Sequence, residues 1–380
     1  MVSIRQSKQI TSLEEFRRRV PNEETALRLL EAMVWQNGRF CPRCGGAETR
    51  SIRGPRPGLY ECCACRRQFR ATTRTPLHGT KLPIRRWLEA IYLTLMSSKG
   101  VSSVVLARQI GIDQASAWKI AHAIRLLMRP PAEEHLTGTV EIDTVAVAGD
   151  PKKRNIRRYG PVGKHIYNPP GRGSEAPTTL VAIEKTQANV TTSTRAGRVR
   201  VAAIDSLSAA HIGPILSGMV DSGTVLHSDD DTAFRKLGAS FSGHETVVHS
   251  DQEFARGDVH INTVEGFNST IRRAYLGVWH YWSEEHGQRY MEELAFRAGQ
   301  REVVRKTRKV RGKVKMRSIS EPRPVLDQMR ELFAHAVGRE MRRTETWSVI
   351  EIDRSTPAAQ VTTRRGSSLK QQKADDHIPF

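Results

Sequence analysis

The chain has 380 residues, more than a single hydrophobic core usually organises, so we expect two or more domains. Its 60 Lys and Arg against 40 Asp and Glu leave a formal charge of +20, which favours a polyanion such as nucleic acid as partner. Basic ribosomal and membrane-surface proteins share this balance, but no window approaches the roughly 18 uncharged apolar residues of a membrane-spanning helix.

The first region, residues 1–37, is predicted to be a helical lead-in. Apolar residues recur there at helical spacing on both sides of Pro21, which interrupts the pattern. The amino terminus has no apolar stretch typical of a secretory signal. We therefore expect a cytoplasmic protein without a membrane partner.

Residues 38–80 contain all five cysteines of the chain, which indicates one metal site rather than scattered disulfides. The segments CPRC and CCAC each place two cysteines three positions apart, and four thiolates at that spacing suit one tetrahedral, structural zinc ion. Cys63 has poor ligand spacing and is predicted to be a bystander. The predicted ligands are Cys41, Cys44, Cys62 and Cys65.

Residues 81–130 are predicted to be helical and to contain a helix-turn-helix-like motif. Pro83 precedes an amphipathic helix, and the later segment GVSSVVLARQIGIDQASAWKI has the apolar and glycine pattern of two helices around a turn. Simple packing explains such a pair as well as DNA contact does. If the motif binds DNA, Lys119 and Arg125 are the candidate contacts.

A mixed α/β domain is predicted for residues 133–300. Three β-rich runs, TVEIDTVAVAG, TTLVAIEK and RVRVAAI, precede a helix, a strand, a short helix, a strand and a long helix from about Asn262. This order is similar to that of a ribonuclease H-like domain, a mixed sheet flanked by helices. The basic stretch 149–177 is predicted to be a mobile loop over the site.

Three carboxylates in this domain are candidates for catalysis. Asp143 shares a strand face with Glu141, and Asp229 ends the apolar strand GTVLHSD, although Asp230 and Asp231 compete with it. Glu265 lies seven residues before Arg272, on the same helical face. Three such carboxylates are able to hold two Mg²⁺ or Mn²⁺ ions about 3.5 to 4 Å apart for phosphodiester chemistry.

The last region, residues 301–380, is predicted to contain a basic linker, an amphipathic helix and a disordered tail. Nine of the seventeen residues from 301 to 317 are basic, so the segment should stay solvated until it meets a polyanion. The pattern at 325–343 predicts the helix, and a polar tail follows from about residue 354.

The motifs together resemble insertion-sequence transposases that join a zinc ribbon to a DDE catalytic domain of ribonuclease H-like fold. The resemblance spans roughly residues 15 to 300, through CPRCGG, YECCACRRQF, EIDTVAVAG, HSDDDTAF and HINTVEGFNSTIRR. It implies Asp143, Asp229 and Glu265 as catalytic ligands of magnesium. The 35 residues between the last two match the family spacing.

The resemblance also implies how the protein works. Arg272, and more weakly Asn262, would lie near DNA phosphates, while the enzyme cuts transposon ends and joins the 3′-hydroxyl to target DNA. Pairing of two ends implies a homodimer or larger assembly in the nucleoid. The alternative is a regulator that binds DNA through ribbon and helix-turn-helix without catalysis. Thr144, where the family commonly has an acidic residue, is a departure.

Overall fold

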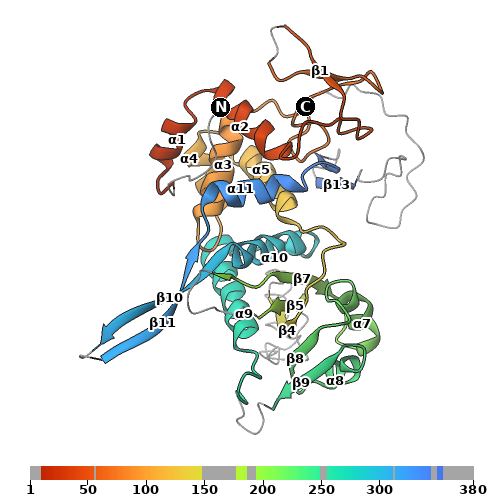
Figure 1. Ribbon diagram of the computed structural model, residues 1–380, viewed down its shortest axis with the longest axis vertical. Helices are drawn as coiled ribbons and strands as arrows, with labels where there is room; N and C mark the ends of the chain where they lie inside the picture. The colour runs from red at the N-terminus through yellow and green to blue at the C-terminus, as the bar shows by residue number, and fades with distance from the viewer. Residues whose placement is uncertain are drawn as a thin grey trace, which may run out of the picture.

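The computed structural model describes residues 10–54, 57–147, 177–185, 194–248, 255–310, 313–343 and 349–353. The predicted loop 149–177, except for its last residue, and the tail beyond residue 353 lie outside these ranges. The described chain forms an upper helical part that carries the zinc ribbon and a lower part built on a sheet (Figure 1). None of the described helices is long and apolar enough to cross a membrane.

The upper part is a cluster of helices around one hydrophobic core. Ser12 and Asn22 cap the first two helices through their side chains, and Pro21 lies between these helices, as the sequence indicated. The helices are α1 (Leu13–Arg19), α2 (Glu23–Val34), α3 (Ile84–Met96), α4 (Ser103–Ile110), α5 (Gln114–Met128) and α11 (Val325–Ala334).

The predicted helix-turn-helix is present as α4 and α5. Gly111 ends α4 in the left-handed conformation at φ 67°, a backbone state that favours glycine, and Asp113 caps α5 by accepting a hydrogen bond from the Ser116 N–H. The C-terminal α11 packs on α2 and α3, so the two ends of the described chain share one core. That core explains the amphipathic pattern predicted after residue 325.

The lower part contains a five-stranded mixed sheet with the strand order β7-β5-β4-β8-β9. The pairs β4/β5 and β5/β7 are antiparallel, whereas β4/β8 and β8/β9 are parallel. This arrangement confirms the ribonuclease H-like class predicted from the element order. The strands are β4 (Thr139–Ala146), β5 (Thr178–Glu184), β7 (Val199–Ile204), β8 (Val225–Asp229) and β9 (Gly243–Val247).

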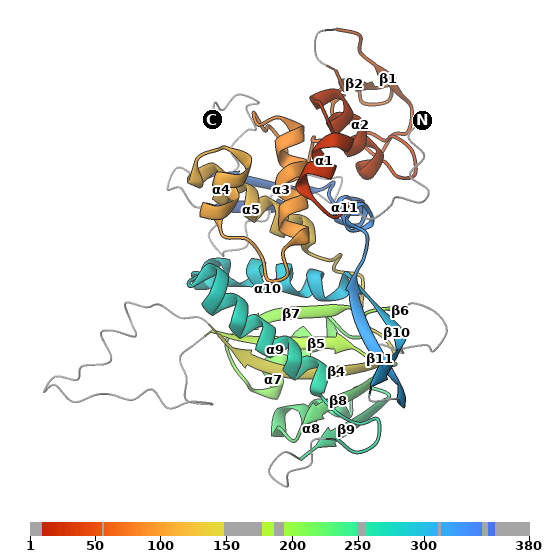
Figure 2. The ribbon, with the colours of Figure 1, turned by 90° about the vertical axis from the view of Figure 1, so that its left-hand side faces the viewer.

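Helices cover both faces of the sheet (Figure 2). Val140 and Ile142 of β4 pack toward α7 (Ala209–Ser217) and α8 (Thr232–Gly238), in a core of their own. Val145, at the opposite phase of the same strand, belongs to the core under α9 (Asn262–Ala274), the π-helical turn η2 (Tyr275–Trp279) and α10 (Glu284–Gly299). The alternation fixes which β4 side chains face α9.

The predicted basic linker is instead a β-hairpin of β10 (Arg301–Val310) and β11 (Lys313–Pro322), paired antiparallel along ten positions. The base of β10 also pairs with the short β6 (Thr194–Arg195). The predicted helix over 325–343 ends at Ala334, and β12 (Arg339–Arg343) then pairs with β13 (Val349–Asp353). The density of like charge in residues 301–317 predicted a solvated linker. The pairing of β10 with β11 and β6 could not be read from that charge pattern.

Candidate active site and zinc centre

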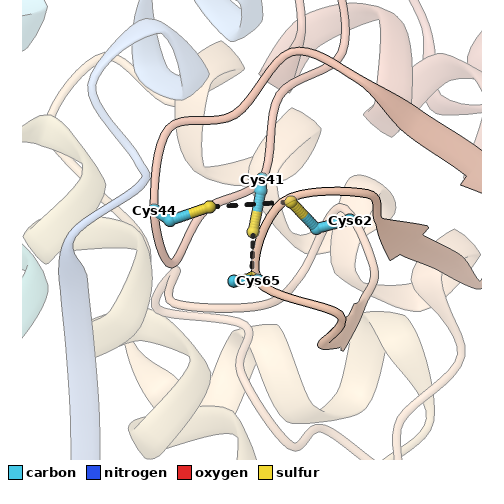
Figure 3. Close-up of side chains that lie close together, drawn as sticks. All are labelled: Cys41, Cys44, Cys62 and Cys65. Carbon is cyan, nitrogen blue, oxygen red and sulfur yellow. Dashed lines mark hydrogen bonds between the residues drawn. The ribbon is translucent and has the colours of Figure 1, made fainter.

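The four predicted zinc ligands converge at the tip of the ribbon (Figure 3). Their sulfur atoms all lie within 4.8 Å of one another, with Cys41 Sγ 3.7 Å from Cys65 Sγ and Cys44 Sγ 3.6 Å from Cys62 Sγ. A tetrahedral zinc ion with Zn–S bonds of about 2.3 Å requires sulfurs roughly 3.8 Å apart. The four thiols therefore fit zinc, and Cys63 is exposed and outside the cluster, as predicted.

The two knuckles have the same backbone design. The Gly45 N–H donates to the Cys41 carbonyl, the Arg66 N–H donates to the Cys62 carbonyl, and Gly45 and Arg66 adopt φ angles of 76° and 60°. A hydrogen bond from the Cys65 backbone N–H lowers the pKa of Cys62 to about 7, whereas burial raises the pKa of Cys41 to about 12. A metal ion favours the thiolate of every ligand.

The ribbon, which consists of β1 (Thr49–Ser51), β2 (Tyr60–Cys62) and β3 (Gln68–Phe69), is docked on the helical part. The Trp35 ring contacts the Tyr60 and Phe69 rings edge-on at 5.4 and 6.1 Å between centroids. Zinc is therefore not the sole source of folding energy for the ribbon, because the ribbon shares the helical core.

Asp143 and Asp229 lie at the same level on neighbouring parallel strands. The β4/β8 register pairs Glu141 with His227. Asp143 lies two residues after Glu141, and Asp229 lies two residues after His227. Residues two apart lie on one face of a strand. The two aspartates thus lie on the same face of the sheet, Asp143 within β4 and Asp229 at the last residue of β8.

The two acidic neighbours of Asp229 are engaged elsewhere. Asp231 is the N-cap of α8 and accepts from the Ala233 N–H at 2.8 Å, while Asp230 lies 3.3 Å from the Arg235 guanidinium. Asp229 Oδ1 accepts the Asp231 N–H at 3.3 Å. Asp230 and Asp231 thus have structural contacts with α8, which favours Asp229 as the candidate catalytic aspartate.

Glu265 lies in the first turn of α9, the helix that packs on β4 and β5, and its charge acts on Asp143. Burial, and next the negative charges of Asp229 and Glu265, raise the pKa of Asp143 to about 6. Hydrogen bonds from the Thr144 N–H at 2.7 Å and from Asn268 Nδ2 at 2.8 Å oppose this rise by stabilising the carboxylate. Each Asp143 oxygen retains a lone pair for a cation.

Two residues of the site, Glu141 and Asn268, had no predicted role. Glu141 is fully buried, and its Oε2 accepts the Thr263 and Val264 N–H groups at 2.8 and 3.1 Å, so it caps the start of α9. The helix has no side-chain cap of its own. The shared strand face of Glu141 and Asp143, and the three-residue step from Glu265 to Asn268, were the available signals in the sequence.

The four predicted DNA contacts are placed differently. Arg272 and Asn262 are exposed on α9, and Arg272 stands two turns, about 10 Å, along the helix from Glu265. Lys119 is half-buried on α5.

Arg125 was predicted to contact DNA, and this prediction is wrong. Its guanidinium is 3% exposed, 2.7 Å from Glu293 and 3.9 Å above the Tyr290 ring, where it joins α5 to α10. Arg125 lies on an apolar helix, and the glutamate with which it pairs is 168 residues away in the sequence. The sequence therefore gave no sign of this buried ion pair.

Comparisons with known proteins agree with this architecture. Residues 135–299 match the sequence model of the ISXO2-like transposase domain, and residues 21–68 match that of the transposase zinc-ribbon domain. An uncharacterized protein in transposable element ISH50 of Halobacterium salinarum is 27% identical over 303 residues, which cover 79% of this chain and 96% of that protein. The chain combines both domains and belongs to the zinc-ribbon transposases of insertion sequences.

Proposed function

We propose that the chain cuts phosphodiester bonds at the ends of an insertion sequence and joins the freed 3′-hydroxyl to target DNA. The proposal is supported by the positions of Asp143 and Asp229 at one level of two neighbouring parallel strands, with Glu265 on the first turn of the helix that packs on β4. Burial, and next the charges of Asp229 and Glu265, raise the pKa of Asp143, and a bound divalent cation would stabilise the ionised carboxylate.

Asp143, Asp229 and Glu265 would hold two Mg²⁺ or Mn²⁺ ions, since carboxylate oxygens are the ligands these ions prefer. When bound, the ions supply Lewis-acid activation and neutralise charge on the phosphate. Asn268 keeps the Asp143 carboxylate oriented, and Glu141 holds the first turn of α9 against β4. Arg272, exposed farther along α9, would contact a neighbouring phosphate.

The remaining parts of the chain would bind the DNA ends. The zinc ribbon and the α4/α5 motif stand apart from the catalytic sheet, so recognition of terminal repeats is separate from cleavage (Figure 1). Lys119 is the α5 residue assigned to this contact. Because two ends must be brought together, we infer a homodimer or larger assembly on DNA, in the nucleoid.

An assay of DNA cleavage tests this function. The substrate would be the inverted repeats sought in the DNA that flanks the gene, and cleavage at their ends should require Mg²⁺ or Mn²⁺. Asp143→Ala and Asp229→Ala should each abolish cleavage while end binding persists. Cleavage that survives both substitutions would overturn the catalytic assignment, and specific binding without cleavage by the unsubstituted protein would favour a DNA-binding regulator.

A further inference from the structure

The hairpin of β10 and β11 has a base that is fixed to the catalytic domain. Glu302 and Val303 pair with β6, and the Arg301 carbonyl accepts the Ala196 N–H at 2.8 Å. At the other strand, Arg301 Nε donates to Ser320 Oγ at 2.7 Å. These contacts set the direction in which the rest of the hairpin leaves the domain.

Beyond this base the hairpin is an arm. From Val304 to Val310, β10 pairs with β11, and the arm projects from the body of the molecule (Figure 1). Seven residues at about 3.4 Å each give a length of roughly 24 Å. An isolated two-stranded ribbon is marginally stable in water, so an arm of this kind needs a partner surface.

The register gathers positive charge on one face of the arm. Lys306 is paired with Arg317 and Arg308 with Lys315, so two consecutive cross-strand pairs carry like charge. Lys313, opposite Val310, lies on the same face. Like charges directly opposite each other destabilise a ribbon unless an anion lies between or above them. We call these five positions the basic face.

The opposite face of the arm is different in composition. Its cross-strand pairs are Arg305 with Ser318, Thr307 with Met316 and Lys309 with Val314, none of which joins two cations. The paired cations lie on one face only, and like charges side by side do not stabilise a solvated ribbon. This difference between the faces favours the basic face as the one that contacts a ligand.

We propose that this arm binds duplex DNA through its basic face, with the ribbon in the major groove. The major groove is about 12 Å wide and admits a two-stranded β-ribbon. The inference rests on the proposed function, since the DNA held by the arm is the DNA on which the catalytic domain acts. The arm thereby lengthens the DNA contact beyond what α9 and the α4/α5 motif reach.

The test compares two variants that each remove two positive charges from the same hairpin. Arg308→Gln with Lys315→Gln acts on the basic face, and Arg305→Gln with Lys309→Gln is the matched control on the opposite face. Binding to a fluorescent random-sequence duplex is measured by anisotropy over a range of salt, without added Mg²⁺. Omitting Mg²⁺ separates binding by the arm from the catalytic proposal.

The basic-face variant should lower the slope of log affinity against log salt by about 2 and weaken binding at 0.1 M salt on the order of tenfold or more. The opposite-face variant should show a clearly smaller change. Equal losses in both variants, or none in either, would overturn the proposal. So would unchanged DNA binding accompanied by lost binding to vesicles of anionic phospholipid.

A truncated arm provides a second readout that does not depend on charge substitution. Replacing residues 306–317 by Asn-Gly closes the ribbon after the Arg305/Ser318 pair with a favoured two-residue turn and leaves the β6 contacts in place. The truncated protein should bind the duplex at least as weakly as the basic-face variant, because it lacks the whole basic face, while it still cleaves terminal-repeat DNA at saturating concentrations. Full affinity in the truncated protein would contradict the proposal.

Discussion

Glu141 of β4 and Thr263 of α9 are joined by two hydrogen bonds, from the Thr263 N–H at 2.8 Å and from its hydroxyl at 2.9 Å. The carboxylate is buried and stands two residues before Asp143, while Thr263 stands two residues before Glu265. This contact therefore fixes β4 to the first turn of α9 next to Asp143 and Glu265, the two residues proposed as metal ligands. Glu141 acts as a positioning residue.

Glu141→Gln should lower the free energy of unfolding by about 2 to 3 kcal/mol, because the amide places a donor against backbone N–H groups. It should also lower kcat for cleavage and raise the Mg²⁺ concentration needed for half-maximal activity, with little change in KM for DNA. Thr263→Val is the control: it removes only the hydroxyl donor and should cost about 1 kcal/mol. A stability loss with unchanged metal dependence would assign Glu141 to folding alone.

Asp143→Asn should stabilise the metal-free protein near neutral pH. Burial and like charges raise the Asp143 pKa from 3.8 to about 6, which corresponds to at most about 3 kcal/mol of strain in the ionised folded state. Loss of one acceptor for the Thr144 N–H offsets about 1 kcal/mol, leaving a gain of about 1 to 2 kcal/mol.

The gain has a defined pH window. The folded protein holds the Asp143 proton more tightly than the unfolded chain, so ionisation lowers stability as pH rises from about 4 to about 6. The advantage of Asp143→Asn should therefore be present above pH 6 and disappear near pH 4 in denaturant titrations. Mg²⁺ should raise the Tm of the unsubstituted protein more than that of the variant. A variant that is less stable at pH 7 would refute this account.

Arg125→Ala should destabilise the protein by about 1.5 to 3 kcal/mol, since it removes the 2.7 Å partner of the buried Glu293, which keeps Arg297 at 2.6 Å. Lys119→Ala, on the same helix, should lower DNA affinity with little effect on stability. Normal stability with weakened DNA binding in Arg125→Ala would restore the original DNA-contact interpretation.

Zinc content is predicted to be one ion per chain. Cys62→Ser should lose the ion, whereas Cys63→Ser should retain it, because only the first thiol belongs to the four that converge. Chelation should disorder the two zinc knuckles while leaving most of the α-helical signal in circular dichroism, since helices supply most residues of the core that the ribbon shares. Loss of zinc from both variants would contradict the ligand assignment.

The fold class and zinc site were predictable because they depend on local patterns. Cysteine spacing, strand alternation around Ile142 and the glycine at 111 each report a nearby geometry. The hairpin from residue 301 was missed because its density of like charge indicated a solvated linker, and because the pairing of its base with β6 joins segments about a hundred residues apart. The role of Arg125 was hidden for the same reason, since Glu293 lies 168 residues away.

Sequence motifs indicate the candidate catalytic residues, but the acidic run at 229–231 offers three possible positions for the second of them. Local structure helps where sequence did not: Asp231 caps α8 and Asp230 lies beside Arg235, leaving Asp229 at the strand end. Glu141 was seen to share a face with Asp143, but its helix-capping role depends on where α9 begins. That position is set by tertiary packing and not by a capping residue of the helix itself.

The most direct test of the catalytic site is a metal-specificity switch at Asp229, with cleavage of terminal-repeat DNA measured in Mg²⁺ and in Mn²⁺. Asp229→Cys replaces an oxygen ligand by sulfur, which Mg²⁺ binds poorly and Mn²⁺ tolerates better. The account predicts no cleavage by this variant in Mg²⁺, partial recovery in Mn²⁺, and activity of the matched Asp230→Cys variant in both. Full activity of Asp229→Cys in Mg²⁺ would contradict it.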